Sequence, residues 1–120
     1  MTQETLAVGA YGERLAVQHL LDQGMALLDR NWRAETGGEI DIIARDGNTL
    51  VFCEVKTRRG AGFGTPGEAV GTEKIRRLRR LAAQWLALSG LRPPEVRFDV
   101  VEILPQRKGA TRVRHLRAAF

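Results

Sequence analysis

The sequence contains little cysteine and histidine and no long hydrophobic run. Its single cysteine, Cys53, excludes a disulfide bond within the chain, and its position among valines predicts a buried thiol. The two histidines and the cysteine do not have the spacing of metal ligands, which argues against a zinc site. No apolar stretch approaches membrane-spanning length and the N-terminus lacks a signal-peptide pattern. We therefore expect a cytoplasmic protein that does not bind a membrane.

The composition is that of an ordinary globular domain with an excess of positive charge. At 120 residues the chain is long enough for one hydrophobic core, so we expect a single domain spanning residues 1–120. Nineteen Lys and Arg against fourteen Asp and Glu give a net charge of +5. This excess predicts a polyanionic partner, with nucleic acid as the first candidate. The residue types alone do not distinguish DNA from RNA.

Residues 38–59 contain the most informative pattern in the chain. Two runs of alternating, β-branched residues flank Asp46-Gly47-Asn48 and predict a β-hairpin. If Asp46 pairs with Thr49 across the turn, Asp41 lies directly opposite Glu54. Directly opposed side chains are about 5 Å apart at Cβ. Two carboxylates that close repel one another unless a cation lies between them.

A divalent ion is one way to relieve this repulsion. Magnesium takes oxygen ligands, usually one or two carboxylates together with water and substrate phosphate. Asp41 and Glu54 would supply the carboxylates, the Val55 carbonyl is a further candidate ligand, and manganese is the alternative ion. Lys56 shares a strand face with Glu54 and could hold a water or stabilise a phosphate, as in metal-assisted phosphodiester hydrolysis. The plain alternative is a solvated strand face with a Glu–Lys pair, because Glu-x-Lys alone is a weak signal.

The two motifs together resemble those of a known family. Gly38-Glu39-Ile40-Asp41 with Glu54-Val55-Lys56-Thr57-Arg58 is similar to the YraN-like family of small bacterial proteins, within the PD-(D/E)xK nuclease superfamily. Ile40 stands where the superfamily name has proline. The resemblance runs from about Gly12 to the C-terminus. It implies a restriction-endonuclease-like fold, magnesium-dependent endonuclease activity, and DNA ahead of RNA as the substrate. By analogy with the similar Holliday-junction resolvases, it also implies branched DNA and a homodimer with two active sites.

Residues 6–23 predict an amphipathic helix with a carboxylate, Glu13, in its apolar stripe. The stripe consists of Leu6, Ala10, Val17, Leu20 and Leu21. A carboxylate directed at a core is costly unless it is paired or bound to metal. Glu13 is therefore either in a salt bridge with an arginine or a third acid facing Asp41 and Glu54. In the resembling family a glutamate at this place in Gly12-Glu13-Arg14 completes the acidic site, which favours the second interpretation.

The other predicted elements complete an α/β arrangement. Residues 25–34 predict a strand, 72–89 a second amphipathic helix ended by Gly90, 95–104 a strand, and 111–116 a last edge strand. The predicted order is helix, three strands, helix, and one or two strands. The second helix can act as a crossover that allows parallel pairing within a mixed sheet. His19 and His115 are expected at the surface.

Several basic residues are candidates for contacts with nucleic acid. Arg58 and Arg59 begin a glycine-rich segment that is suited to gripping a phosphate backbone. The outer face of the second helix carries Arg76, Arg77 and Arg80. Lys74 lies on the inner side near the start of this helix and matches a lysine in the resembling family. The alternative is a flexible surface loop beside a solvated helix face. A protein that keeps the nuclease fold and binds DNA or RNA without cutting it therefore remains the second functional hypothesis.

Overall fold

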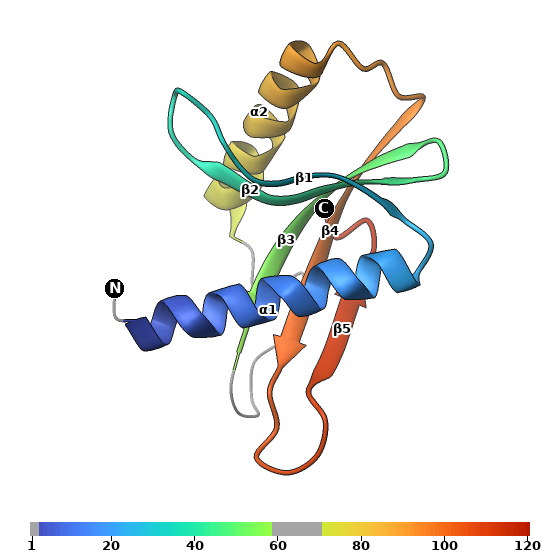
Figure 1. Ribbon diagram of the computed structural model, residues 1–120. Coiled ribbons are helices and arrows are strands. Elements are labelled where there is room, and N and C mark those ends of the chain that lie inside the picture. The colour runs from blue at the N-terminus through green and yellow to red at the C-terminus, as the bar shows by residue number, and fades with distance from the viewer. Residues whose placement is uncertain (1–2, 59–70) are drawn as a thin grey trace.

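The computed structural model describes residues 3–58 and 71–120, with two helices and a five-stranded sheet (Figure 1). The elements in chain order are α1 (Gln3–Asp22), β1 (Ala26–Arg33), β2 (Glu39–Asp46), β3 (Thr49–Thr57), α2 (Thr72–Ser89), β4 (Glu95–Leu104) and β5 (Arg112–Leu116). This order confirms the predicted succession. The segment at 59–70, which contains Arg59, lies outside the described residues.

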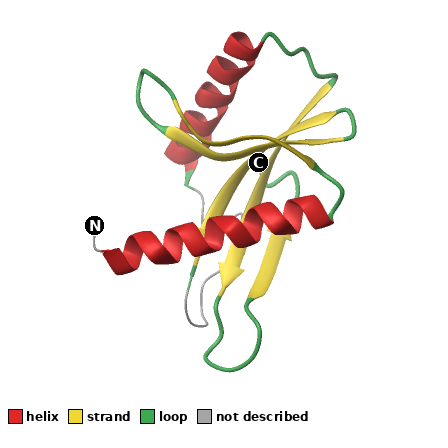
Figure 2. Cartoon of the chain, in the orientation of Figure 1, coloured by secondary structure: helices red, strands yellow, loops and turns green. Residues whose placement is uncertain are grey.

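The sheet is mixed, and its strands lie side by side in chain order (Figure 2). β1, β2 and β3 pair antiparallel, β3 and β4 pair parallel, and β5 returns antiparallel to β4. A parallel neighbour requires the chain to return to the same end of the sheet, and the connection between β3 and β4 contains α2. The structure therefore confirms an α/β fold that is compatible with the restriction-endonuclease-like architecture.

The hairpin register is the one that the turn predicts. Asp46 pairs with Thr49, and the ladder runs to the pair Ile42–Cys53. Beyond that pair, the Asp41 carboxylate takes over the link between the strands, because the Val55 N–H donates to its Oδ2 at 2.8 Å. The end of the hairpin ladder therefore fixes the Asp41 side chain beside β3.

The two faces of the sheet carry separate hydrophobic cores. The core on the α1 side consists of Ala16, Leu20, Met25, Ile42, Ala44, Val51, Cys53, Val101 and Ile103. The core on the α2 side consists of Ile40, Ile43, Leu50, Phe52, Leu81, Ala82, Trp85 and Phe98. Figure 1 shows α1 crossing the strands on one face and α2 lying apart from it. Cys53 is buried, as predicted.

The buried face of α1 differs from the predicted stripe. Gly12, Ala16 and Leu20 face the sheet, whereas Leu21 is 43% exposed and Ala10 is also exposed. Leu20 is buried and Val17 packs against the core, as predicted. Ala10 and Leu21 were placed wrongly, because α1 turns its small residues Gly12 and Ala16 toward the sheet. The stripe of α2 is confirmed, with Leu78, Leu81, Ala82 and Trp85 buried. In the described part of the chain, no helix is both long and apolar enough to cross a membrane.

Candidate active site

Several of the predicted site residues line one cavity at the open end of the hairpin. This cavity has a volume of about 310 Å³ and lies where the start of β2, the end of β3 and the first turns of α2 meet. Its lining residues are Gly38, Glu39, Asp41, Glu54, Val55, Lys74, Arg77 and Leu78. The fold therefore brings together residues that are more than thirty positions apart in the sequence, such as Asp41 and Lys74.

The surroundings of Asp41 disfavour its negative charge. Burial and the negative charge of Glu54 raise the pKa of Asp41 to about 7, and Glu13 and Glu39 add to the increase. The hydrogen bond from the Val55 N–H acts in the opposite direction but does not cancel them. The repulsion between carboxylates that the hairpin register predicts is thus present. A carboxyl group in a cavity with its pKa raised to near 7 is a common feature of functional sites.

Glu54 is neutralised by a pair of lysines. Its side chain is only 6% exposed, and its Oε1 atom is 2.5 Å from Lys74 Nζ and 3.5 Å from Lys56 Nζ. Lys74, which sequence analysis placed on the inner side of its helix, therefore reaches the acidic cluster from α2. A buried carboxylate is tolerated only when it is paired in this way.

The two lysines titrate differently. Burial lowers the pKa of Lys56, and the charge of Lys74 lowers it further, although Glu54 acts in the opposite direction. Burial also disfavours the charge on Lys74, but its hydrogen bond to Glu54 and the charge of Glu54 outweigh this and raise its pKa. Lys74 therefore retains its positive charge, whereas Lys56 gives up its proton more easily.

Glu13 approaches the same cluster from α1 and has a weak partner. Its Oε1 atom is 4.0 Å from Arg30 Nη2, and its side chain is 17% exposed. Within the described part of the chain, this buried oxygen has no hydrogen-bond partner. Glu13 also contributes to the raised pKa of Asp41. Both interpretations of Glu13 are therefore partly realised, since it contacts an arginine loosely and faces Asp41 electrostatically.

A glycine permits this approach of α1. A Cβ atom on Gly12 would lie 1.8 Å from Thr57 Oγ1 at the end of β3, a distance that no side chain can occupy. Gly12 therefore lets the helix backbone contact the strand that carries Glu54 and Lys56. Glu13, the next residue, is held close to the acidic cluster as a result.

The carboxylate oxygens of this cluster are of the chemical kind that magnesium binds. Magnesium usually takes one or two carboxylates and completes its shell with water and phosphate. Asp41 and Glu54 would supply two carboxylates, and among the described residues the buried Glu13 Oε1 has no hydrogen-bond partner. Among residues 3–58 and 71–120, no three His, Cys, Asp or Glu side chains form a group that could hold a metal ion by themselves. An ion would therefore rely on water and substrate, and Lys74 would have to release Glu54.

Comparison with known proteins places the chain in a family. Residues 12–103 match the family described as Uncharacterised protein family UPF0102. The chain belongs to this family. The UPF0102 protein of Beutenbergia cavernae is 57% identical over 111 residues, which cover 92% of this chain and 93% of that protein. The UPF0102 protein of a Nocardioides species is 53% identical over 111 residues, covering 92% and 89%. The UPF0102 protein of Streptomyces coelicolor is 53% identical over 112 residues, covering 92% and 86%.

UPF0102 is the YraN-like family that the two motifs resemble, so the resemblance inferred from the sequence is confirmed. The matched residues include both motifs and the first-helix glutamate, Glu13. Neither the family description nor the names of these relatives states an activity. The function of the UPF0102 chain must therefore be argued from its site.

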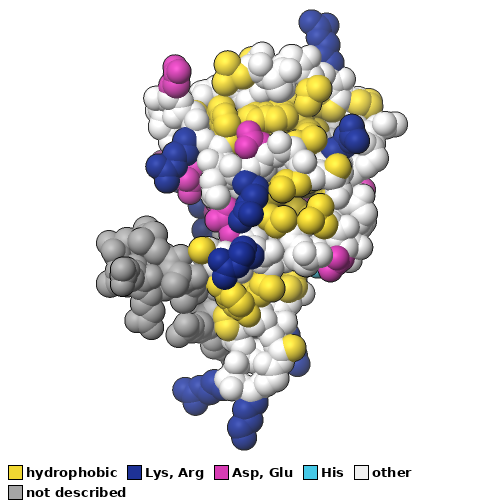
Figure 3. Space-filling model, in the orientation of Figure 1, with side chains coloured by type: hydrophobic (Ala, Val, Ile, Leu, Met, Phe, Trp, Pro, Cys, Tyr) yellow, Lys and Arg dark blue, Asp and Glu magenta, His cyan; other side chains and the backbone are white. Residues whose placement is uncertain are grey.

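The predicted nucleic-acid contacts of the UPF0102 chain fall into two groups. Arg77 lines the cavity together with Lys74, and Arg76 and Arg80 are exposed on α2. Figure 3 shows Lys and Arg side chains spread over one face of the molecule, interspersed with a few acidic ones. Of these arginines, Arg77 lines the cavity, and Arg76 and Arg80 lie on the exposed surface of the same helix.

Arg58 is in a different environment from the one expected. Its Nε atom is 3.4 Å from Glu102 Oε2, its side chain is 22% exposed, and its backbone N–H donates to the Ile103 carbonyl. Glu102 is fully buried on β4 and also accepts hydrogen bonds from Arg114 of β5. Arg58 therefore takes part in an ion-pair network that joins three strands.

Sequence reasoning missed a buried polar network on the α1 face of the UPF0102 fold. His115 Nε2 is 2.8 Å from Asp99 Oδ2, and His115 Nδ1 is 3.0 Å from His19 Nε2. The His115 side chain is 8% exposed, so the expectation of a surface residue was wrong. Arg97 donates two further hydrogen bonds to the Asp99 carboxylate. The one available signal was Asp99 itself, because a carboxylate within an apolar strand requires partners.

Proposed function

We propose that this UPF0102 protein is a magnesium-dependent endonuclease that hydrolyses phosphodiester bonds in DNA, with manganese as an alternative ion. The observation that carries the proposal is the cavity in which Asp41 and Glu54 repel one another beside two lysines. Paired carboxylates with neighbouring lysines are a set of groups that can hold a metal ion and a phosphate for hydrolysis. A structural ion pair alone would not need Asp41 at this position.

Each residue has a distinct role in this proposal. Asp41 and Glu54 hold the ion, the Val55 carbonyl is a further candidate ligand, and Glu13 completes the acidic site. The bound ion would polarise the phosphate and lower the pKa of a coordinated water. Lys56, 3.5 Å from Glu54, would position the attacking water or stabilise the charge that develops on the phosphate.

The basic residues at the cavity bind the substrate in this proposal. Lys74, now paired with Glu54, would stabilise charge on the phosphate once Glu54 held an ion. Arg77 lies at the wall of the same cavity and binds a neighbouring phosphate. Arg76 and Arg80, exposed on α2, extend this contact along the backbone. The resemblance to junction resolvases favours branched DNA, which a homodimer with two active sites would cut symmetrically.

A second candidate function follows from the ion pair between Lys74 and Glu54. The Lys74 ammonium already neutralises a carboxylate that the proposed ion needs. If that pair persists when DNA binds, the protein keeps the nuclease fold and binds nucleic acid without cutting it. The two candidates differ in whether a divalent ion can displace Lys74 from Glu54.

Incubation with defined substrates separates the two candidates. Labelled branched, duplex and single-stranded DNA would be incubated with the protein in magnesium, manganese or EDTA. We expect cutting with either metal, no cutting in EDTA, and preference for the branched substrate. Binding of these DNAs without cutting in either metal would contradict the nuclease proposal, support the binding protein, and make RNA the next ligand to test.

A further inference from the structure

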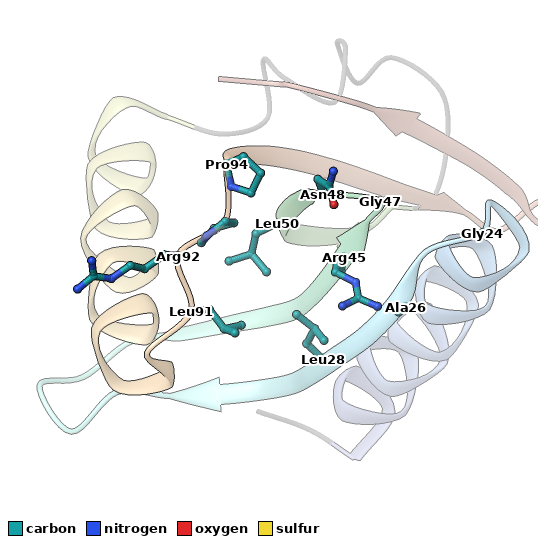
Figure 4. A pocket seen from close by; sticks show the side chains of 11 residues that line it. Gly24, Ala26, Leu28, Arg45, Gly47, Asn48, Leu50, Leu91, Arg92 and Pro94 are labelled. Atoms are coloured by element: carbon teal, nitrogen blue, oxygen red, sulfur yellow. The ribbon is translucent and has the colours of Figure 1, made fainter.

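A cavity of about 660 Å³ lies at the opposite end of the hairpin from the candidate active site (Figure 4). It is bounded by the start of β1, the turn between β2 and β3, and the segment that follows α2. Its lining residues are Gly24, Ala26, Leu28, Arg45, Gly47, Asn48, Leu50, Leu91, Arg92, Pro93 and Pro94. It shares no residue with the cavity that contains Asp41 and Glu54.

The inner surface of this cavity is aliphatic. Figure 4 shows the side chains of Leu28, Leu50 and Leu91 converging on the same hollow from three different segments. Leu50 belongs to the core, whereas Leu28 is 38% exposed and Leu91 is 49% exposed. Exposed apolar side chains that gather in a concave site with a polar edge are typical of an interaction surface. An isolated exposed leucine would carry no such meaning.

Positive charge accompanies the aliphatic surface. Arg45 lies along the cavity wall beside Leu28, and Arg92 extends outward from the segment after α2 (Figure 4). Within the described residues neither arginine forms an ion pair, and the nearby Asp46 carboxylate is already paired with Arg97 and Arg117. A ligand that brought its own carboxylates would therefore meet unneutralised guanidinium groups.

We propose that this cavity binds a short segment of a partner protein in which an aliphatic side chain is flanked by acidic residues. The aliphatic side chain would occupy the space between Leu28 and Leu91, and one carboxylate would face Arg45, while Arg92 at the outer side of the segment after α2 would attract acidic residues beyond the cavity edge. The polar Gly47-Asn48 turn at the edge offers hydrogen-bonding groups to the peptide backbone. The cavity volume suits a few side chains, since sites for compact ligands are usually about 300–1,000 Å³.

The lining residues disfavour two other occupants. Among the residues that the structure describes, no aromatic side chain lines the cavity, so a nucleobase would lack the stacking surface on which single-stranded nucleic acid relies. A second copy of this chain carries a net charge of +5 and would bring an excess of positive charge to an already positive surface. An acidic peptide satisfies both the charge and the aliphatic surface. The proposal does not rest on the nuclease activity, because the two cavities lie at opposite ends of the hairpin.

The probe is a peptide selected from a random library by its binding to the protein. Random heptapeptides displayed on phage would be selected against the full immobilised chain in EDTA, so that nuclease chemistry plays no part. We expect the enriched sequences to combine Leu, Ile, Val or Met with neighbouring Asp or Glu. Absence of enrichment, or enrichment of sequences without this combination, would overturn the proposal.

Binding of the most enriched peptide would then be measured by fluorescence polarisation with three variants. Arg45→Glu and Leu91→Ser change exposed positions in the cavity, and Arg107→Glu makes the same charge change at an exposed turn outside it. We expect Arg45→Glu and Leu91→Ser each to weaken binding by about 10-fold or more, and Arg107→Glu by less than about 2-fold. Equal effects of Arg45→Glu and Arg107→Glu would show nonspecific attraction and contradict the site.

Two competitors identify the occupant. An acidic peptide without aliphatic side chains should displace the probe only weakly, because it would leave the space between Leu28 and Leu91 empty. A single-stranded oligonucleotide should not compete at equal concentration. Equal competition by either would replace the proposed site with a general polyanion site or a nucleic-acid site.

Discussion

Asp41 combines burial with a neighbouring carboxylate, and both oppose its ionisation in the folded protein. Its pKa is raised from the ordinary value near 4 to about 7. The folded state therefore keeps a proton that the unfolded state releases, and the protein loses stability as the pH rises from about 4 to about 7. Above this window the loss is complete. Sites that bind substrates or ions often carry such a cost in the free protein.

The Asp41→Asn variant should be more stable than the wild type at pH 8. Asparagine cannot ionise, and its amide oxygen can still accept the hydrogen bond from the Val55 N–H. Since one unit of pKa shift corresponds to about 1.4 kcal/mol, we expect a gain on the order of 1–3 kcal/mol at pH 8 in EDTA. The gain should disappear near pH 4. Urea unfolding at both pH values measures it, and a wild type as stable as the variant at pH 8 would contradict the assigned pKa.

At the scale of elements, α1 contacts β3 through Gly12, which brings Glu13 close to the acidic cluster. The Gly12→Ala variant would place a methyl group on the Thr57 hydroxyl, so the Thr57 side chain, the helix or the strand must shift. We expect a loss of about 1–3 kcal/mol in the free energy of unfolding, which denaturant titration measures.

Two further variants distinguish a local clash from a general effect on the helix. Gly9→Ala lies in the same helix, where an added Cβ meets nothing within 4 Å, and it should stabilise by up to about 1 kcal/mol. Adding Thr57→Ala to Gly12→Ala removes the clashing hydroxyl and should recover part of the loss. If the double variant is no more stable than Gly12→Ala alone, Thr57 is not the cause.

The second half of α1 is joined to β5 by the contact between His19 and His115. Burial, together with the nearby His115 and Arg117, lowers the pKa of His19. The unfolded chain therefore takes up a proton below about pH 6.5 that the folded chain does not, and this histidine lowers stability as the pH falls.

His19→Gln should remove this part of the pH dependence. Glutamine can still donate to His115, but it cannot be protonated. The wild type should lose stability relative to the variant between pH 7 and pH 5, as measured by urea unfolding at intermediate values. The contribution of Asp41 is the same in both proteins and cancels in the difference. A constant difference across this range would mean that His19 does not titrate with a lowered pKa.

The elements differ in how far the sequence could predict them. The bounds of α2 and β4 were predicted to the residue, because Gly90 and Pro93-Pro94 separate two strongly patterned segments. The turn at Gly47-Asn48 was enough to predict the register of β2 and β3, and therefore the approach of Asp41 to Glu54. The buried face of α1 was predicted only in part: Leu20 is buried as expected, but the small residues Gly12 and Ala16 also face the sheet.

Long-range polar partners could not be predicted. Asp99 and Glu102 sit in an apolar strand, which shows that each needs a partner but does not say which one. Their partners, His115 and Arg114, belong to a short strand with alternating polarity that looks solvated in the sequence. Only the pairing of β4 with β5 brings these residues together.

At the scale of the whole molecule, we expect the excess of positive charge to attract nucleic acid, with the arginines of α2 contacting its phosphates. Arg76 and Arg80 are exposed there, beside the cavity that Arg77 lines. Each phosphate contact contributes about 0.9 to the slope of log affinity against log salt concentration for duplex DNA. We expect the double variant Arg76→Gln and Arg80→Gln to lose about two phosphate contacts. The magnitude of the slope, measured in EDTA, should therefore fall by about 1.8.

The Arg107→Gln variant is the matched control, because Arg107 is exposed on a turn away from α2. It should leave the slope nearly unchanged. If the control changes the slope as much as the double variant does, DNA binds to the overall charge of the protein and α2 has no special role.

The cutting of a branched DNA by the wild type and by Asp41→Asn tests the proposed function most directly. Both proteins would be compared under single-turnover conditions in magnesium, with Asp22→Asn, an exposed carboxylate on α1, as the control for the loss of one negative charge. We predict that the wild type and Asp22→Asn cut at similar rates and that Asp41→Asn binds the DNA without cutting it. Cutting by Asp41→Asn at the wild-type rate would contradict the assignment of this site.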